Sequence, residues 1–83
     1  MYTVYIIRSS SHKRYYVGST HDLPNRLREH NNGESASTRF GIPWELVHSE
    51  EFPTRADAVR RERMIKARGI ERYLTDINKH KMD

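Results

Sequence analysis

The chain has 83 residues, of which 31% are charged and none is cysteine, and its formal net charge is +4. This length predicts one domain over residues 1–83, and the missing cysteine excludes disulfides, thiolate metal sites and thiol nucleophiles. The apolar run from Val4 to Ile7 is far shorter than the ~18 residues of a membrane span, and no segment has the composition of a signal peptide. We therefore expect a small cytoplasmic protein with no membrane partner.

The positive charge is concentrated in the last third of the chain. Residues 1–53 hold six Lys or Arg and six Asp or Glu, whereas residues 54–83 hold nine against five. A basic segment of this kind is typical of proteins that neutralise nucleic-acid phosphates. The alternative is a helix whose charged face is simply solvated.

The first half of the chain predicts a β-hairpin followed by a helix. Aromatic and β-branched residues favour strands over residues 2–8 and 15–19, which a polar loop connects. Asp22 is a suitable N-cap and Pro24 fits the first helical turn, so we expect a helix over residues 23–31.

The second half predicts a strand and two helices. The expected elements are an irregular loop up to residue 43, a strand over residues 44–52, and helices over residues 55–68 and 70–79. Thr54 and Asp57 form a start similar to a capping box, and Gly69 separates the two helices. The order β-β-α-β-α-α predicts an α+β domain built around a small sheet.

The register of the hairpin decides which side chains share a face of the sheet. If the loop is symmetric, the sequence numbers of two residues paired across the hairpin add up to 23. The alternation of side chains then places residues 4, 6 and 17 on one core-like face. Tyr5, Tyr16 and Gly18 share the opposite face, where the missing side chain of Gly18 leaves a hollow lined by two phenols. The alternative is a pair of ordinary strand tyrosines with exposed tips.

The first helix carries Arg26 and His30 one turn apart, so they form one stripe. A guanidinium grips two phosphate oxygens, and an imidazole supplies or accepts a proton, so this pair suits a phosphodiester. The alternative is a pair that faces solvent.

The helix over residues 55–68 carries a carboxylate on its apolar stripe. Glu62 lies between Ala58 and Ile65 at core-facing spacing. A carboxylate there is costly unless it is paired or bound to a cation. Two interpretations remain open: a salt bridge to Arg26 or a neighbouring arginine, and a ligand for Mg²⁺, which accepts a single carboxylate plus waters.

Taken together, these residues resemble the GIY-YIG nuclease domain. The matching elements are Thr3-Val4-Tyr5, Tyr16-Val17-Gly18, Arg26 and His30 ten and fourteen residues after Tyr16, and Glu62 within the string that runs from Ala58 to Lys66. The resemblance extends from residue 2 to about residue 68. It looks most like the short, stand-alone bacterial branch, whose members lack an appended DNA-binding domain.

The resemblance implies a small three-stranded antiparallel sheet flanked by helices, and an endonuclease that hydrolyses DNA with one divalent ion, Mg²⁺ or Mn²⁺, in repair or recombination. Glu62 would bind the metal, and Arg26 would hold the scissile phosphate. Tyr5 and Tyr16 would orient or deprotonate the attacking water, with their pKa lowered by Arg26 and the metal. His30 would assist proton transfer or hold the phosphate. No organic cofactor is implied.

The chain departs from the family pattern at three places. Thr3-Val4 replaces Gly-Ile, Val17 replaces Ile, and Ser19 stands where DNA-repair relatives often carry Lys. We expect Ser19, Arg26 and Lys66 to contact DNA through its backbone, with little sequence specificity. The alternatives are a catalytically idle nucleic-acid-binding module and a module that recruits a protein partner.

Overall fold

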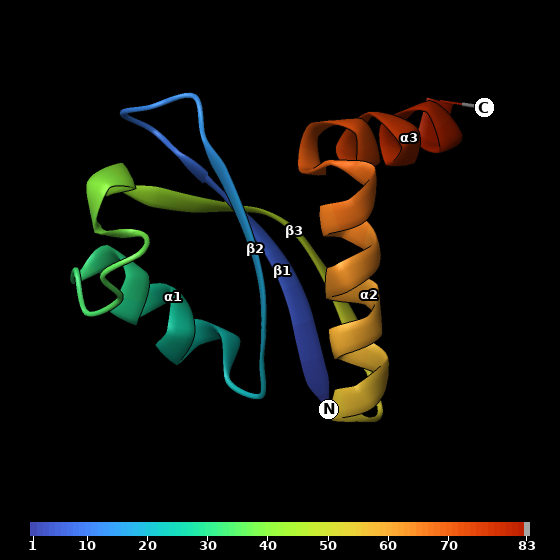
Figure 1. Ribbon diagram of the computed structural model, residues 1–83, viewed down its shortest axis with the longest axis horizontal. Helices are drawn as coiled ribbons and strands as arrows, with labels where there is room; N and C mark the ends of the chain where they lie inside the picture. The colour runs from blue at the N-terminus through green and yellow to red at the C-terminus, as the bar shows by residue number, and fades with distance from the viewer. Residues whose placement is uncertain (83) are drawn as a thin grey trace.

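The computed structural model describes residues 1–82 and has the predicted order of strands and helices (Figure 1). The elements are β1 (Tyr2–Ser9), β2 (Tyr15–Thr20), α1 (Leu23–Asn31), a 3₁₀ helix η1 (Arg39–Gly41), β3 (Trp44–Phe52), α2 (Arg55–Arg68) and α3 (Ile70–Met82). The three strands form one antiparallel sheet in the order β2-β1-β3, which confirms the α+β fold. Four expectations were inexact: β1 and β2 each end one residue later than expected, α3 continues past residue 79, and the segment before β3 contains η1.

The hairpin has the predicted symmetric register. Tyr5 pairs with Gly18, and Val4 pairs with Ser19, so the paired numbers sum to 23 throughout. Side-chain alternation therefore separates two apolar clusters on opposite faces of the sheet. One contains Val4, Ile6, Val17, Ala58, Ile65 and Tyr73, and the other contains Tyr5, Ile7 and Trp44.

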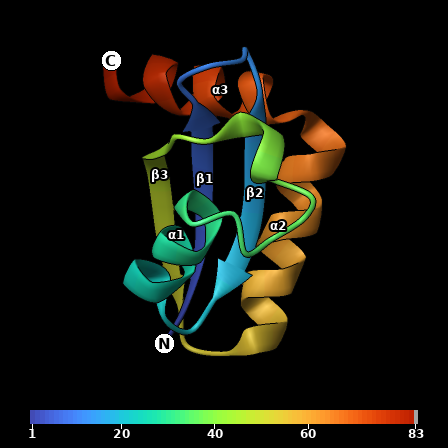
Figure 2. The same ribbon diagram turned by 90° about the vertical axis from the view of Figure 1, so that its left-hand side faces the viewer.

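Helices cover both faces of this sheet. Figures 1 and 2 show α1 against one face, and α2 and α3 against the other. The contacts agree, because Leu23 and Leu27 of α1 pack on the Tyr5 cluster while Ala58 and Ile65 of α2 belong to the Val4 cluster. In Figure 2, α2 runs alongside β2, the edge strand, so residues of α2 lie close to that edge.

The ends of α1 and α2 follow from the capping residues that the sequence shows. The Asp22 side chain accepts a hydrogen bond from the backbone of Asn25, and the Thr54 side chain accepts one from Asp57. Gly69 ends α2 with φ +96°, a backbone conformation that favours glycine, and α3 leaves at a sharp angle (Figure 1).

A polar cluster that the sequence did not predict connects β3 with α2 and α3. Glu50 accepts a hydrogen bond from the Tyr73 hydroxyl, lies 2.7 Å from His48 Nε2 and pairs with Arg61 at 3.5 Å. Burial alone would raise the pKa of Glu50, but its hydrogen bonds to Tyr73 and His48 hold that pKa below its usual value. The carboxylate is therefore ionised and joins three elements at one point.

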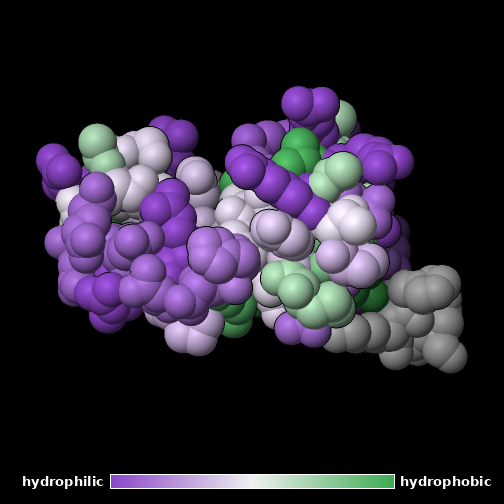
Figure 3. Space-filling view, turned by 90° about the horizontal axis from the view of Figure 1, so that it is seen from below, coloured by the Kyte–Doolittle hydropathy of each residue, from purple (hydrophilic) through white to green (hydrophobic). Residues whose placement is uncertain are grey.

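The described surface is mainly polar. Figure 3 shows hydrophilic residues over most of the face seen from below, with hydrophobic residues in small separate areas. None of the helices within residues 1–82 has the length and apolar character that crossing a membrane requires.

Candidate active site

Two tyrosines and a histidine meet on the face of the sheet that α1 covers. The Tyr5 and Tyr16 ring centroids lie 6.3 Å apart, and the His30 ring lies 5.8 Å from Tyr5 and 5.1 Å from Tyr16. Tyr5 comes from β1, Tyr16 from β2 and His30 from the last turn of α1. The structure thus brings together three of the predicted site residues.

The space above Gly18 is filled, in contrast to the open hollow that the sequence suggested. A Cβ atom at Gly18 would lie 2.7 Å from Tyr5 Oη and 3.1 Å from Tyr16 Cε2. Tyr5 is only 1% exposed, so its hydroxyl is not an exposed tip. Glycine is required here because the end of the Tyr5 ring approaches the backbone of β2 closely.

His30 is fully buried and does not face solvent, so the interpretation of an exposed Arg26–His30 stripe is wrong for the histidine. Its Nε2 lies 2.8 Å from Tyr5 Oη, and its Nδ1 lies 2.7 Å from Thr38 Oγ1. The Thr38 hydroxyl donates to the Ser35 carbonyl at 3.4 Å, so it accepts from Nδ1–H, and Nε2 accepts from the Tyr5 hydroxyl. His30 therefore acts on the site through Tyr5.

Thr38 is a site residue that sequence reasoning missed. It is 1% exposed, and its carbonyl accepts a hydrogen bond from Trp44 Nε1 at 2.7 Å. Thr38 lies in a polar stretch without helical or strand periodicity, so the spacing of apolar residues does not predict that it is buried. The only hint is its position shortly before Trp44, whose large side chain needs a polar partner when buried.

Replacing Thr38 by Val should lower the free energy of unfolding by about 1–3 kcal/mol, because His30 Nδ1–H would lose its buried acceptor. Urea denaturation measures this change. Thr38→Ser keeps the hydroxyl and should cost less than Thr38→Val. Thr75→Val is the matched control, since Thr75 is exposed on α3 and its replacement should change stability by less than about 0.5 kcal/mol. Wild-type stability of Thr38→Val would contradict the assigned hydrogen bond.

Arg26 lies at the opening of this cluster. Its side chain is 34% exposed and pairs with Glu29 at 3.2 Å. Hydrogen bonding to Tyr5 raises the pKa of the Arg26 guanidinium, against the opposing effect of burial. The guanidinium is thus close to the Tyr5 hydroxyl and still accessible to an anion.

The environment moves the pKa of Tyr5 in the direction opposite to the expected one. Burial raises the pKa of Tyr5 to about 12, although its hydrogen bond with Arg26 acts to lower it. Tyr5 therefore remains a protonated phenol at neutral pH. Tyr16 is the more exposed of the two phenols.

His30 is held neutral, because burial, followed by the charge of Arg26, lowers its pKa. In the unfolded chain, a histidine takes up a proton near pH 6.5. The unfolded state then binds more protons than the folded state below that pH, so stability should fall as the pH drops from about 7.5 to 5.5.

Urea unfolding at several pH values, with NMR titration of the His30 ring, measures this dependence. The fall should persist in His12→Asn and His21→Asn, whose side chains are exposed. A His30 ring that titrates in the folded protein near pH 6.5 would contradict it.

Glu62 lies on α2, the helix that runs alongside β2. Its negative charge contributes to the raised pKa of Tyr5, after the larger effect of burial. Its side chain is 20% exposed, and Glu62 Oε2 pairs with Lys66 Nζ at 2.9 Å. The predicted salt bridge of Glu62 is thus present, but its partner is Lys66 and not an arginine.

The donor set at Glu62 fits a hydrated divalent cation. Among the described residues, no three His, Cys, Asp or Glu side chains are grouped closely enough to enclose a metal ion. Glu62 therefore offers one carboxylate, and the ammonium of Lys66 shows that a cation is accommodated there. Mg²⁺ is commonly held by one or two carboxylates together with waters and substrate phosphates, so a single carboxylate is compatible with this ion.

Ser19 lies apart from the tyrosine cluster. It pairs with Val4, so its side chain is on the α2 face of the sheet. There it lines a cavity of about 310 Å³ together with Arg55 and Val59. The structure thus gathers Tyr5, Tyr16, Arg26 and His30 on the α1 face, whereas Glu62 and Lys66 are on α2, the helix that covers the face where Ser19 lies.

The three-stranded sheet and its flanking helices form a small α+β domain that brings two tyrosines, a histidine and an arginine together. Residues 1–73 match the GIY-YIG catalytic domain, so the chain belongs to the GIY-YIG family. Within that family it is similar to a UPF0213 protein of Haloquadratum walsbyi, with 48% identity over 65 residues that cover 77% of this chain and 72% of the relative.

A longer protein and a solved structure are also similar. The structure-specific endonuclease subunit Slx1 of Schizosaccharomyces pombe is 37% identical, in a match that covers 90% of this chain but only 30% of the relative. The solution NMR structure of a UPF0213 protein from Bacillus halodurans has a TM-score of 0.57 and 28% identity, and the match covers 94% of this chain and 84% of that chain.

Proposed function

We propose that this protein is a metal-dependent endonuclease that hydrolyses DNA phosphodiester bonds with little sequence specificity, in repair or recombination. One observation supports the proposal above the others: Tyr5, Tyr16 and His30 meet on the face that α1 covers, next to an arginine, Arg26, that is 34% exposed. The Glu62 carboxylate, whose charge acts on Tyr5, also favours a nuclease, because a module that only binds nucleic acid gains nothing from a negative charge that repels the backbone.

The catalytic role that we propose for each residue depends on how exposed its side chain is. Arg26 binds the scissile phosphate and offsets the negative charge that develops on it. Tyr16, the more exposed phenol, orients the attacking water or takes its proton. Tyr5 is a protonated phenol and therefore orients its neighbours, and His30 fixes the direction of the Tyr5 hydroxyl from inside.

Glu62 would hold the divalent ion, Mg²⁺ or Mn²⁺. Such an ion, when bound, polarises a phosphoryl oxygen and stabilises the leaving oxygen. Lys66 must then release the carboxylate, and its ammonium becomes available to a DNA phosphate one helical turn away. One cation then replaces another at Glu62, and the divalent ion would bring one more positive charge than the ammonium, which the negative phosphate of the substrate offsets.

Incubation of the protein with branched and linear DNA tests the proposal. We expect cleavage with Mg²⁺ or Mn²⁺, and none with EDTA. DNA binding without cleavage in any divalent metal would instead indicate an idle nucleic-acid-binding module.

A protein partner is a second candidate function, because the fission-yeast relative is named as a subunit. Capture of a protein without any salt-dependent DNA binding would favour a recruiting module over the nuclease.

A further inference from the structure

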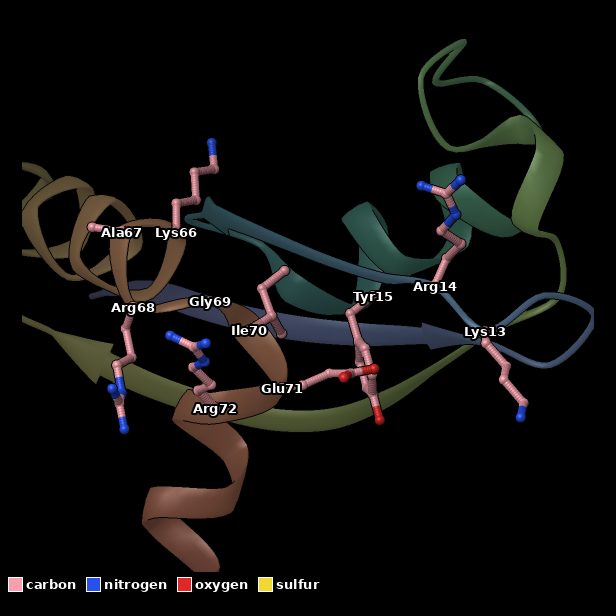
Figure 4. Close-up of a pocket in the computed structure, with 10 residues that line it drawn as sticks. All are labelled: Lys13, Arg14, Tyr15, Lys66, Ala67, Arg68, Gly69, Ile70, Glu71 and Arg72. Carbon is pink, nitrogen blue, oxygen red and sulfur yellow. The ribbon is translucent and has the colours of Figure 1, made fainter.

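A basic pocket shares only Lys66 with the residues that the catalytic proposal uses. It has a volume of about 480 Å³ and lies between the β1–β2 loop and the corner where α2 meets α3 (Figure 4). We call it the corner pocket. Its charged lining residues are Lys13, Arg14, Lys66, Arg68, Arg72 and Glu71. Five cations from separate parts of the chain thus surround one space with a single carboxylate.

Most of this positive charge is not neutralised by the protein. Lys66 pairs with Glu62, and Arg68 pairs with Asp76 in an exposed ion pair. Lys13, Arg14 and Arg72 form no ion pair with the side chains described over residues 1–79. The fold therefore combines the basic last third of the sequence with two cations of the hairpin loop, at one place.

One residue, Lys66, links the corner pocket to the candidate metal ligand Glu62. Lys66 lines the pocket and also contacts Glu62, one helical turn or about 6 Å along α2. Figure 4 shows that Arg14 and Lys66 project to the same side of the sheet. Arg14 precedes Gly18 by four residues, which is about 13 Å along an extended strand. Lys66 and Arg14 thus place positive charge between Glu62 and the hairpin loop.

We propose that the corner pocket binds backbone phosphates of the nucleic acid on one side of the scissile phosphate, a proposal that rests on the proposed function for the position of the scissile bond. Arginine is suited to this ligand, because its planar guanidinium binds two phosphate oxygens at once. A span of about 13 Å corresponds to roughly four nucleotides at the rise of about 3.4 Å per nucleotide in duplex DNA. The substrate therefore extends at least that far beyond the cleaved bond, toward the corner of α2 and α3.

The test measures DNA binding without metal, so it does not depend on cleavage. A fluorescein-labelled duplex is titrated in EDTA at several salt concentrations with wild type and with the double variant Arg14→Gln/Arg72→Gln. Each phosphate contact contributes about 0.9 to the slope of log K against log salt, so the variant should lower that slope by about two. Its affinity at low salt should fall about tenfold or more.

The matched control is Arg63→Gln/Lys79→Gln, which removes the same charge from exposed positions that do not line the corner pocket. It should leave the slope within about half a unit of the wild-type value. Melting temperatures of both variants identify any loss of folding, and the single Arg14→Gln variant, in a loop, keeps the test valid if Arg72→Gln unfolds α3.

Three outcomes would overturn the proposal: equal losses in the two double variants, a wild-type slope in the pocket variant, or wild type that binds polyglutamate more tightly than DNA. The last result would assign the pocket to an acidic protein partner. If wild type fails to cleave DNA but the pocket variant alone loses binding, the pocket stands and the proposed function falls. If wild type cleaves DNA and the pocket variant binds DNA normally, the proposed function stands and the pocket proposal falls.

Discussion

Glu62→Gln is expected to reduce metal-dependent cleavage by about 10²–10³-fold, because a metal ion supplies several kcal/mol of transition-state stabilisation and each 1.4 kcal/mol is worth a factor of ten. The amide keeps the size of the side chain but loses the charge that attracts a cation. Mn²⁺ binding, measured by calorimetry, should fall with the activity. Glu45→Gln is the control, since Glu45 is exposed on β3 and its replacement should leave both measurements unchanged.

The same variant should fold almost normally. The Glu62–Lys66 pair joins side chains that are 20% and 58% exposed, and such pairs contribute about 0.2–1 kcal/mol. A loss of this size lowers the melting temperature of a domain this small by only a few degrees. A much larger fall, with Mn²⁺ binding unchanged, would show that Glu62 is a structural residue. Cleavage at the wild-type rate would remove Glu62 from the mechanism.

The hairpin and the helix caps could be predicted because they depend on local rules. A symmetric loop fixed the parity of the β1–β2 register, and parity alone places Tyr5 and Gly18 opposite each other. Asp22 and Thr54 accept the capping hydrogen bonds that their positions predict. Each of these inferences uses residues within about fifteen positions of one another, where the backbone limits the possible arrangements.

The inner side of the site could not be predicted, because it depends on packing between distant segments. The i, i+4 spacing of Arg26 and His30 puts them on one helical stripe but does not say which is buried, and only the histidine is. Thr38 reaches His30 from a segment with no periodic pattern. The raised pKa of Tyr5 follows from burial by β2 and α1 together, which no single segment shows.

The salt bridge of Glu62 also could not be predicted from the sequence alone. Its stripe on α2 predicts burial, and the side chain is indeed mostly buried. Lys66 lies one helical turn after Glu62, so the correct partner is close in the sequence. However, four neighbouring cations, Lys66 among them, could pair with Glu62, and the sequence alone does not distinguish them. Geometry decides between them: Arg61, for example, turns to Glu50 and Tyr73.

Gly18→Ala is expected to lower the free energy of unfolding by about 1–3 kcal/mol and to reduce cleavage by about 10²-fold. The new Cβ would lie 2.7 Å from Tyr5 Oη and 2.9 Å from Tyr5 Cζ, which is closer than nonbonded atoms approach. Because Tyr5 is enclosed and its hydroxyl bonds to His30, the ring can move only by breaking that bond or displacing β2. A shift of about 1 Å in a positioning group is enough for a loss of this size in rate.

A double-mutant cycle shows whether the Tyr5 hydroxyl is the obstacle. Tyr5→Phe removes the atom nearest to the new methyl group, so Gly18→Ala should cost at least about 0.5 kcal/mol less in the Tyr5→Phe background than in wild type. Urea denaturation of the four proteins measures this coupling. If Gly18→Ala costs the same in both backgrounds, the contact with Oη does not restrict position 18. If the single variant matches wild type in stability and cleavage, the close approach of Tyr5 to the β2 backbone has no role in positioning the site.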